Sequence, residues 1–185
     1  MKIIHVPHPT LRQKAKPVEQ VDTKLKQLVS ELQETLATTT NPQGVGLAAP
    51  QVDKLQRIFA ATLPEIGGMQ SFINPFIADH SGAQTFGPDE DEPYLEGCLS
   101  IPFIYGPVPR YDWIELEFDV IEGDELVTYT QHFEDFAARV MQHELDHLDG
   151  ILFTDYSHQY DLPVYRSKSR SDKMEEIDKS ILNYV

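Results

Sequence analysis

Apolar and polar positions alternate most regularly from residue 114 to residue 120. The apolar positions of this stretch are Ile114, Leu116, Phe118 and Val120. A period of two predicts a half-buried strand. Glu122-Gly123-Asp124 then forms a turn sequence, so residues 125–133 are expected to return as the hairpin partner. Residues 57–62 and 70–78 are rich in Ile, Phe and Ala and predict two further strands.

Helical spacing occurs in two longer segments. The first begins with Asp22 or Thr23 as its cap and ends near Pro42. Its apolar stripe comprises Leu25, Leu28, Val29, Leu32 and Leu36. The second runs from about Glu134 to Leu148, with Gly150 placed to stop it. Its polar stripe is limited to Asp135, Arg139, Gln142, Asp146 and Asp149. A helix that is apolar on most of its circumference is expected to be central and buried.

The remaining segments have weaker patterns. Residues 3–20 contain three prolines and predict an extended arm over the core. Residues 79–95 are polar and acidic, which predicts a loop or a distorted hairpin. After Phe153 the chain becomes polar and irregular. Residues 171–184 predict a last helix, because Met174, Ile177 and Ile181 are spaced for weak packing.

Composition limits the class of protein. A chain of 185 residues with 41% hydrophobic residues fits one globular domain. The net charge of −15 argues against a nucleic-acid-binding module, and no direct DNA binding is expected. No apolar run reaches the roughly 20 residues that a membrane span needs, and Pro7 interrupts any signal-peptide core. We therefore expect a cytoplasmic protein without membrane contact.

The sequence His143-Glu144-Leu145-Asp146-His147 is an H-E-x-x-H pattern within the second helix. Histidines four positions apart project from one helical face and can bind one metal ion, while the glutamate reaches a water beside it. Metzincin proteases would place their third histidine at position 153, where this chain has Phe153. Another H-E-x-x-H metalloprotease could use a downstream glutamate, so that class stays open.

The only cysteine, Cys98, excludes an intrachain disulfide and is the best remaining soft ligand. A lone cysteine is more often a small buried apolar residue. Upstream, the segment 44–51 fits a G-x-G-x-x-G/A dinucleotide fingerprint in its letters alone. That fingerprint requires a strand before it and a helix after it. Here a helix precedes the segment, and Pro50 opposes a following helix, so we favour a loop that allows close approach of a ligand.

Three motifs occur in order: Gly44-Val45-Gly46-Leu47-Ala48-Ala49-Pro50-Gln51, Glu96-Gly97-Cys98-Leu99-Ser100 and Gln142-His143-Glu144-Leu145-Asp146-His147. Together they closely resemble the signature motifs of peptide deformylases, and the resemblance spans roughly residues 3–154. It implies an α+β fold with mixed, mainly antiparallel β-sheets around a central metal-binding helix. Residues 1–185 would form a single catalytic domain, in which residues 155–185 are a divergent C-terminal tail.

The resemblance also implies a reaction. The enzyme would hydrolyse the N-formyl group from the initiator formyl-methionine of newly synthesised polypeptides. Cys98, His143 and His147 would hold one divalent metal ion, with Fe²⁺ expected and Zn²⁺, Ni²⁺ or Co²⁺ as alternatives. Glu144 would accept a proton from the attacking water, while the Gln51 amide and the Leu99 backbone N–H would stabilise the oxyanion.

The same resemblance suggests substrate contacts. The peptide would lie extended between the glycine loop and the Cys98 segment, where Gly46 and Gly97 allow close approach. The predicted lining of the methionine pocket is Val45, Tyr94, Phe136, Arg139 and Val140, although Tyr94 and Phe136 could equally be core residues. Asp146 and Arg110 could pair behind the metal ligands or be unrelated surface charges. Tyr105 departs from many members, which have arginine there, and this departure affects peptide preference.

Two further hypotheses concern partners. The basic residues Arg166, Lys168, Arg170 and Lys173 could place the tail on the ribosome, as the resemblance suggests, but acidic residues follow them and we favour a simple solvated helix. A non-catalytic metal-containing binding protein is the competing class. Such a protein would be expected to lose Gln51, Cys98 or Glu144, and all three are present.

Overall fold

The computed structural model describes residues 1–40, 42–87, 92–167 and 173–184. The α-helices are α1 (Thr23–Thr38), α2 (Asp135–Asp149) and α3 (Phe153–Gln159). Short 3-10 helices cover Pro9–Arg12, Ala49–Val52, Pro64–Ile66 and Lys179–Tyr184. The strands are β1 (Gly46–Ala48), β2 (Ile58–Leu63), β3 (Gly68–His80), β4 (Gln84–Thr85), β5 (Leu95–Cys98), β6 (Ile101–Pro107), β7 (Arg110–Tyr111), β8 (Trp113–Glu122), β9 (Glu125–Glu134), β10 (Val164–Arg166) and β11 (Glu175–Ile177).

The larger sheet is antiparallel, in the order β1-β2-β3-β8-β9. Its longest hairpin confirms the alternation seen in the sequence. Strands β8 and β9 pair without interruption from Trp113 opposite Glu134 to Glu122 opposite Glu125. The inward residues Ile114, Leu116 and Phe118 are buried in the main core, as the period of two requires.

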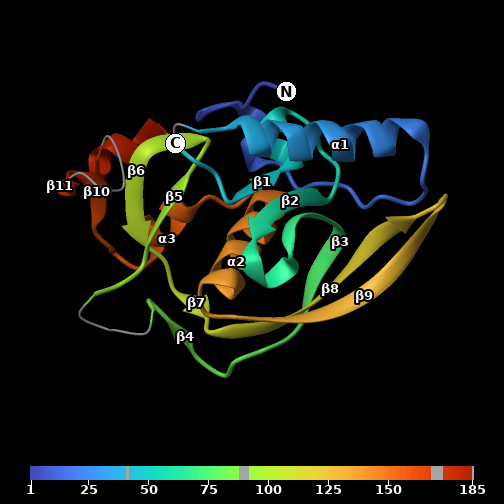
Figure 1. The fold of residues 1–185 in the computed structure, drawn as a ribbon. Coiled ribbons are helices and arrows are strands. Elements are labelled where there is room, and N and C mark those ends of the chain that lie inside the picture. Colours follow the sequence, from blue (N-terminus) through green and yellow to red (C-terminus); the bar gives the residue numbers. More distant parts are fainter. Residues whose placement is uncertain (41, 88–91, 168–172, 185) are drawn as a thin grey trace.

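A second sheet has the order β11-β10-β6-β5, and β4 pairs with β7 in a small two-stranded sheet. Figure 1 shows α2 at the centre of the molecule, between the larger sheet and the strands β5 and β6. Helix α1 runs along one side of the larger sheet. The predicted α+β fold, with mainly antiparallel sheets around a central helix, is confirmed.

Helix α2 is the central element that the sequence predicted, displaced by one residue at each end. It buries Ala138, Val140, Met141, Leu145 and Leu148 in the main core. Gly150 ends the helix with φ 75°, a left-handed conformation that favours glycine. A Cβ at this position would also lie 2.8 Å from the backbone carbon of Arg12. Position 150 therefore requires glycine for both its conformation and its neighbour.

Helix α1 and the N-terminal arm cover the core as expected. The Asp22 side chain caps α1 by accepting a hydrogen bond from Leu25 N at 2.7 Å. The arm is extended apart from its 3-10 turn and is held to the motif segments by backbone hydrogen bonds. Ile4 N donates to Gln51 O and Val6 N donates to Ser100 O, at 2.9 and 3.1 Å. The arm thereby links two of the three motif segments.

The C-terminal predictions need correction. Residues after Phe153, predicted to be irregular, form α3 up to Gln159, since Phe153 and Thr154 are buried there. The predicted helix 171–184 is wrong for the described residues 173–184, which form β11 and a 3-10 helix. Ile177 lies opposite the fully buried Val164 of β10. Three apolar residues are too few to bury a helix, and an extended backbone instead satisfies its hydrogen bonds on the open edge of β10.

The acidic segment 79–95 is partly paired: β3 extends to His80, and Gln84–Thr85 pairs with Arg110–Tyr111. Residues 88–91 lie outside the described residues. The glycine motif forms β1 and a four-residue 3-10 helix, which is not the helix that a dinucleotide fingerprint requires. No helix among the described residues is long and apolar enough to span a membrane.

Candidate active site

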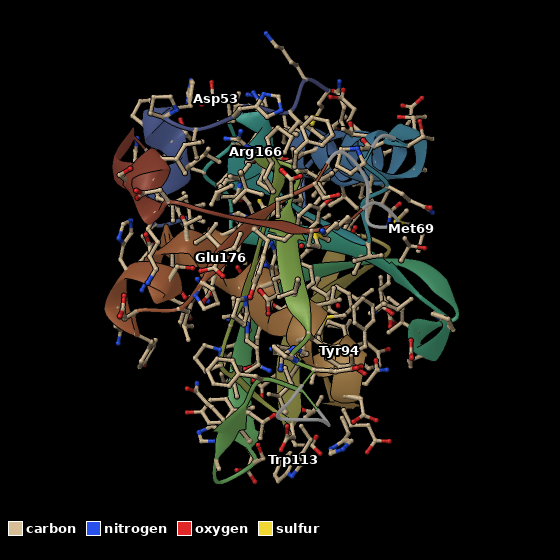
Figure 2. The ribbon with its side chains drawn as sticks, turned by 90° about the vertical axis from the view of Figure 1, so that its left-hand side faces the viewer. Asp53, Met69, Tyr94, Trp113, Arg166 and Glu176 are labelled. Atoms are coloured by element: carbon tan, nitrogen blue, oxygen red, sulfur yellow. The ribbon has the colours of Figure 1, made fainter. Side chains whose placement is uncertain are left out.

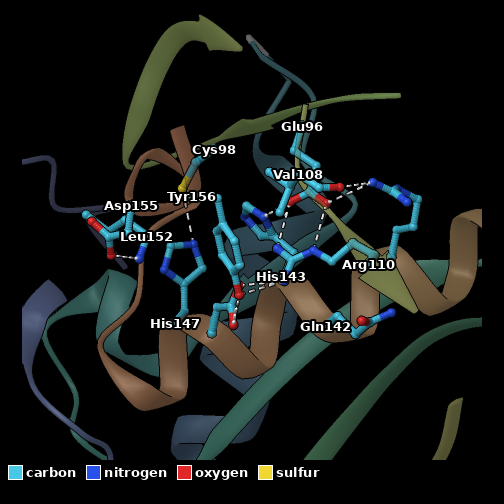
Figure 3. A network of polar contacts seen from close by, with 12 residues as sticks. Glu96, Cys98, Val108, Arg110, Gln142, His143, His147, Leu152, Asp155 and Tyr156 are labelled. Carbon is cyan, nitrogen blue, oxygen red and sulfur yellow. Dashed lines mark hydrogen bonds and ion pairs between the residues drawn. The ribbon is translucent and has the colours of Figure 1, made fainter. Parts of the chain in front are cut away.

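The three predicted metal ligands meet at one point. Cys98 ends β5 immediately before the turn into β6, while His143 and His147 project from α2. One ligand atom from each residue lies within 4.8 Å of the other two. Cys98 Sγ is 3.1 Å from His147 Nε2, a contact drawn in Figure 3. Within the described part of the chain, no other group of three such residues converges in this way.

These donors fit a divalent metal. Donors around one tetrahedral ion with bonds of about 2.0–2.3 Å stand roughly 3.5 Å apart. The observed spacing therefore needs only small side-chain rotations to enclose an ion. Cys98 and His147 are buried, and His147 Nδ1 has no hydrogen-bond partner among the described residues. One thiolate and two imidazoles suit borderline metals such as iron, zinc, nickel and cobalt, and they leave a fourth position open.

A largely buried charge network holds His143. Glu96 Oε2 is 3.0 Å from His143 Nδ1. Arg110 binds the same carboxylate with two hydrogen bonds, from Nε at 2.9 Å and from Nη2 at 2.8 Å. Arg110 Nη1 also donates to Asp146 Oδ2 at 2.6 Å, so the structure brings together the predicted Asp146–Arg110 pair. Figure 3 shows Glu96, Arg110 and His143 converging, from β5, β7 and α2 respectively.

The electrostatics of the network follow from its burial. Burial alone would raise the pKa of Glu96, but the charge and hydrogen bonds of Arg110, together with His143, hold this pKa well below its usual range. Burial would lower the pKa of Arg110, and the carboxylates of Glu96 and Asp146 raise it instead. Burial raises the pKa of Asp146 despite its pairing with Arg110. The network therefore keeps Glu96 ionised as the acceptor for His143.

Two members of this network were not predicted. Glu96 belongs to the second motif, but nothing in the sequence indicates its contact with His143, which is 47 positions away. Tyr156 lies on α3, where its hydroxyl donates to Asp146 Oδ1 at 3.2 Å and its ring faces the Arg110 guanidinium. An acidic residue two positions before the cysteine was a usable signal for Glu96. No comparable signal exists for Tyr156, because α3 itself was missed.

Glu144 lies beside the metal ligands with one oxygen unsatisfied. Its side chain is buried, and Oε2 has no hydrogen-bond partner among the described residues. Burial raises the pKa of Glu144 to about 7. A Cβ built on Gly46 would lie 2.2 Å from Glu144 Oε1, so the carboxylate occupies the space that glycine leaves. Gly46 was predicted to admit the substrate, and the structure gives it this additional role.

Gln51 has a fixed orientation. Its Oε1 accepts a hydrogen bond from Ala48 N at 2.8 Å, so Nε2 must face the opposite way. Nε2 lies 3.2 Å from Ser100 Oγ and 3.5 Å from Cys98 Sγ. Leu99 follows Cys98 in the turn between β5 and β6. Gln51 and Leu99 thus lie on the side of the site where Cys98 enters it.

An open pocket leads to the metal ligands. Its lining contains every residue predicted to bind the substrate: Val45, Gly46, Tyr94, Gly97, Phe136, Arg139 and Val140. Tyr94 and Phe136 are 40% and 42% exposed, which excludes the alternative that they are core residues. Cys98, His143 and Glu144 line the same pocket.

Two residues of the pocket lining, Arg139 and Tyr105, are mostly covered by other parts of the protein. Arg139 is buried, and its guanidinium donates to Thr85 O at 3.1 Å and to Val108 O. Tyr105 is also buried, with its ring where a Cβ of Gly97 would lie, 2.6 Å from the nearest ring atom. Gly97 is therefore required by Tyr105 as well as by its position beside the pocket.

Comparisons with known proteins agree with this geometry. A family profile described as Polypeptide deformylase matches residues 1–162. The peptide deformylase of Rhodopirellula baltica is 40% identical over 158 residues, covering 84% of this chain and 72% of its own. Peptide deformylase 1 of Clostridium perfringens is 41% identical over 146 residues, covering 79% and 90%.

Solved structures lead to the same family. A peptide deformylase from Plasmodium falciparum superposes with a TM-score of 0.72 at 31% identity, covering 84% of this chain and 85% of its own. That of Thermotoga maritima gives 0.70 at 36% identity, covering 84% and 95%. The metalloprotease alternative is not favoured, and Phe153, at the position of a metzincin's third histidine, is a core residue. The family profile, the relatives and the candidate metal site agree, and this chain belongs to the peptide deformylase family.

Proposed function

We propose that this enzyme removes the formyl group from the N-terminal formyl-methionine of newly synthesised polypeptides. One observation carries the proposal. Three ligand atoms that suit a metal converge at the inner end of a pocket, beside a buried carboxylate with one unsatisfied oxygen. A hydrolytic site needs this combination of a Lewis acid position and a nearby base.

Cys98, His143 and His147 would hold the metal, for which we propose Fe²⁺, with Zn²⁺, Ni²⁺ or Co²⁺ able to replace it. When bound, the metal would supply Lewis acidity that activates water and polarises the formyl carbonyl. The hydrogen bond between Glu96 and His143 Nδ1 would fix the ring so that Nε2 faces the ion.

The roles proposed for the other residues follow from their positions. Glu144 accepts a proton from the attacking water and delivers it to the nitrogen of the departing amine. The formamide C–N bond breaks, the formyl carbon leaves as formate with the oxygen of water, and the peptide keeps a free amino group. Gln51 Nε2, oriented by Ala48, and the Leu99 N–H donate to the oxyanion.

The sheet topology supports an extended peptide. Strand β1 is the edge of the larger sheet, and β5 is the edge of the four-stranded sheet. Residues of both strands line the pocket. A peptide between them could add a strand to either edge, with its methionine directed toward Val140 and His143. Tyr94 and Phe136 would then contact the peptide at the mouth of the pocket.

The location and partners of the enzyme stay predictions. We expect it to act in the cytoplasm on nascent chains. The hypothesis of ribosome contact assumes a C-terminal α-helix, whereas residues 173–184 form β11 and a 3-10 helix. Lys168 and Arg170 of the basic cluster lie outside the described residues. Co-sedimentation with ribosomes before and after deletion of the chain beyond Asp161 would test that contact.

The function is tested by metal analysis of anaerobically purified protein combined with a formyl-Met-Ala-Ser assay. We expect about one metal ion per chain and release of formate, both lost in Cys98→Ala. Stoichiometric metal without any formate release from the iron- or nickel-loaded protein would instead indicate a non-catalytic binding protein.

A further inference from the structure

Phe103 has an unusual backbone conformation. Its φ is 66°, in the left-handed region that side chains with a Cβ rarely adopt. The cause lies in the pairing of β5 with β6. Gly97 lies opposite Tyr105 and Cys98 lies opposite Ile101, so residues 102–104 form a bulge with no partner on β5. Phe103 is at the centre of this bulge.

The same residue exposes a large apolar side chain at the pocket. Phe103 is 39% exposed and contributes to the pocket lining, together with the half-exposed rings of Tyr94 and Phe136. An aromatic ring held in an unfavourable conformation beside a binding site indicates a functional constraint more than a packing requirement. Nothing in the role of the metal ligands, Glu144 or Gln51 uses this ring.

The C-terminal strand β10 supports the bulge from its other side. Tyr165 lies opposite Tyr105, and Arg166 lies opposite Ile104. Ser167 N then donates to Phe103 O at 3.1 Å. Strand β11 pairs with the far side of β10. Figure 2 looks onto this side of the molecule and labels Arg166 of β10 and Glu176 of β11, with Tyr94 further along the same face. The match to the family profile ends at residue 162, before β10 begins.

We propose that Phe103 is a specificity-determining residue for the part of the peptide that follows formyl-methionine, and that β10 positions it. The ring would contact an apolar side chain of the second or third residue of the substrate. This inference rests on the proposed function, because it assigns the peptide to the same pocket. The tail is then a support for the mouth of the pocket, built by residues that follow the part of the chain matched by the family profile.

The first experiment compares product peptides that differ in one residue. Binding of Met-Ala-Ser, Met-Leu-Ser and Met-Ala-Leu to the metal-loaded enzyme is measured by calorimetry. Burying part of a leucine side chain against the ring should tighten the binding of Met-Leu-Ser or of Met-Ala-Leu about fivefold relative to Met-Ala-Ser. The ratio of these two affinities is the quantity compared between variants. Phe103→Ala should bring this ratio close to one. The control Phe76→Ala removes another exposed phenylalanine, on β3 and outside the pocket lining, and should leave the ratio unchanged.

Turnover of formyl-Met-Ala-Ser is measured in parallel and separates the two proposals. No formate release would overturn the proposed function, whereas the binding ratios decide the role of Phe103. Equal binding of the three peptides to the wild-type enzyme, or a preference retained in Phe103→Ala, would overturn the inference. Phe103→Gly provides a second variant: it should lose the preference and melt at a higher temperature than Phe103→Ala, since glycine adopts φ 66° without strain.

The role of β10 is tested by Ser167→Pro, which removes the N–H that binds Phe103 O. Ser167→Ala keeps this N–H and is the matched control. We expect the leucine preference to fall at least twofold in Ser167→Pro relative to Ser167→Ala, at an unchanged kcat for formyl-Met-Ala-Ser. An equal preference in the two variants would show that β10 does not position Phe103.

Discussion

The inner end of the pocket and its mouth are built from different interactions. At the inner end, the buried Arg110 is joined to Glu96 and Asp146, whose side chains are only 10% and 15% exposed, by charged hydrogen bonds of 2.6–2.9 Å. At the mouth, Tyr94, Phe103 and Phe136 present rings that are 39–42% exposed. The inner groups are thus fixed before a peptide arrives, whereas the mouth gains its contacts only when the peptide covers it.

This difference separates chemistry from recognition. A base or a metal ligand must be held close to its working geometry, because a small displacement costs a large factor in rate. An aromatic rim contributes by excluding water from apolar surface, and this tolerates variation in position. Changes at the inner end should therefore affect kcat and metal binding, and changes at the mouth should affect KM.

The largest effect is expected for Glu144→Ala. The Glu144 carboxylate lines the pocket next to the metal ligand His143, whereas the Glu96 carboxylate is already paired with Arg110 and His143. Its loss should lower kcat on the order of 10²–10⁴-fold, while Cys98, His143 and His147 still bind one metal ion. Formate release and metal content are measured on the same preparation. Full activity in this variant would refute the assignment of the base.

Arg110→Met should come next, through stability and metal binding. It leaves the carboxylates of Glu96 and Asp146 buried without their shared cation. Removing one partner of a buried pair costs about 3–5 kcal/mol, and loss of a ligand's orienting contact weakens metal binding roughly 10- to 100-fold. Urea denaturation and metal titration provide the two measurements.

A matched control for Arg110 is available on the surface. Arg12 pairs with Asp155, and both side chains are 38% exposed. Arg12→Met should change the free energy of unfolding by about 1 kcal/mol or less and leave metal affinity unaltered. Similar losses in the two variants would mean that burial of the network contributes little.

Gly46→Ala tests how closely the inner end is packed. Its new Cβ would overlap the Glu144 carboxylate at 2.2 Å and displace it. A displacement of about 1 Å can cost 100-fold in rate, so we expect kcat to fall by about that factor without loss of metal. The control is Gly82→Ala, where an added Cβ meets no atom within 4 Å. Unchanged turnover in Gly46→Ala would place the working position of Glu144 elsewhere.

The sequence predicted the central helix and residues that line the pocket, but not the contacts between distant segments or the structure of the tail. Helix α2 has strong periodicity and a glycine stop, and the motifs place Cys98 opposite its histidines. The contact of Glu96 with His143 spans 47 positions, which no local pattern encodes. The tail shared helical spacing with α2 but lacked a surface to bury against, and it formed β11 instead. A positive φ at a bulky residue such as Phe103 leaves no trace in composition or period.

The smallest effect is expected at the mouth, for Phe136→Ala. Phe136 is the second residue of α2 and lines the pocket, but it is 42% exposed, so truncation leaves no cavity in the core. Partial loss of an apolar contact should raise KM about fivefold or less and leave kcat and metal content unchanged. Phe76→Ala, at 47% exposure on β3 and outside the pocket lining, is the control and should alter neither constant. A fall in kcat for Phe136→Ala would show that the mouth also orients the reacting formyl group, and the division between chemistry and recognition would no longer hold.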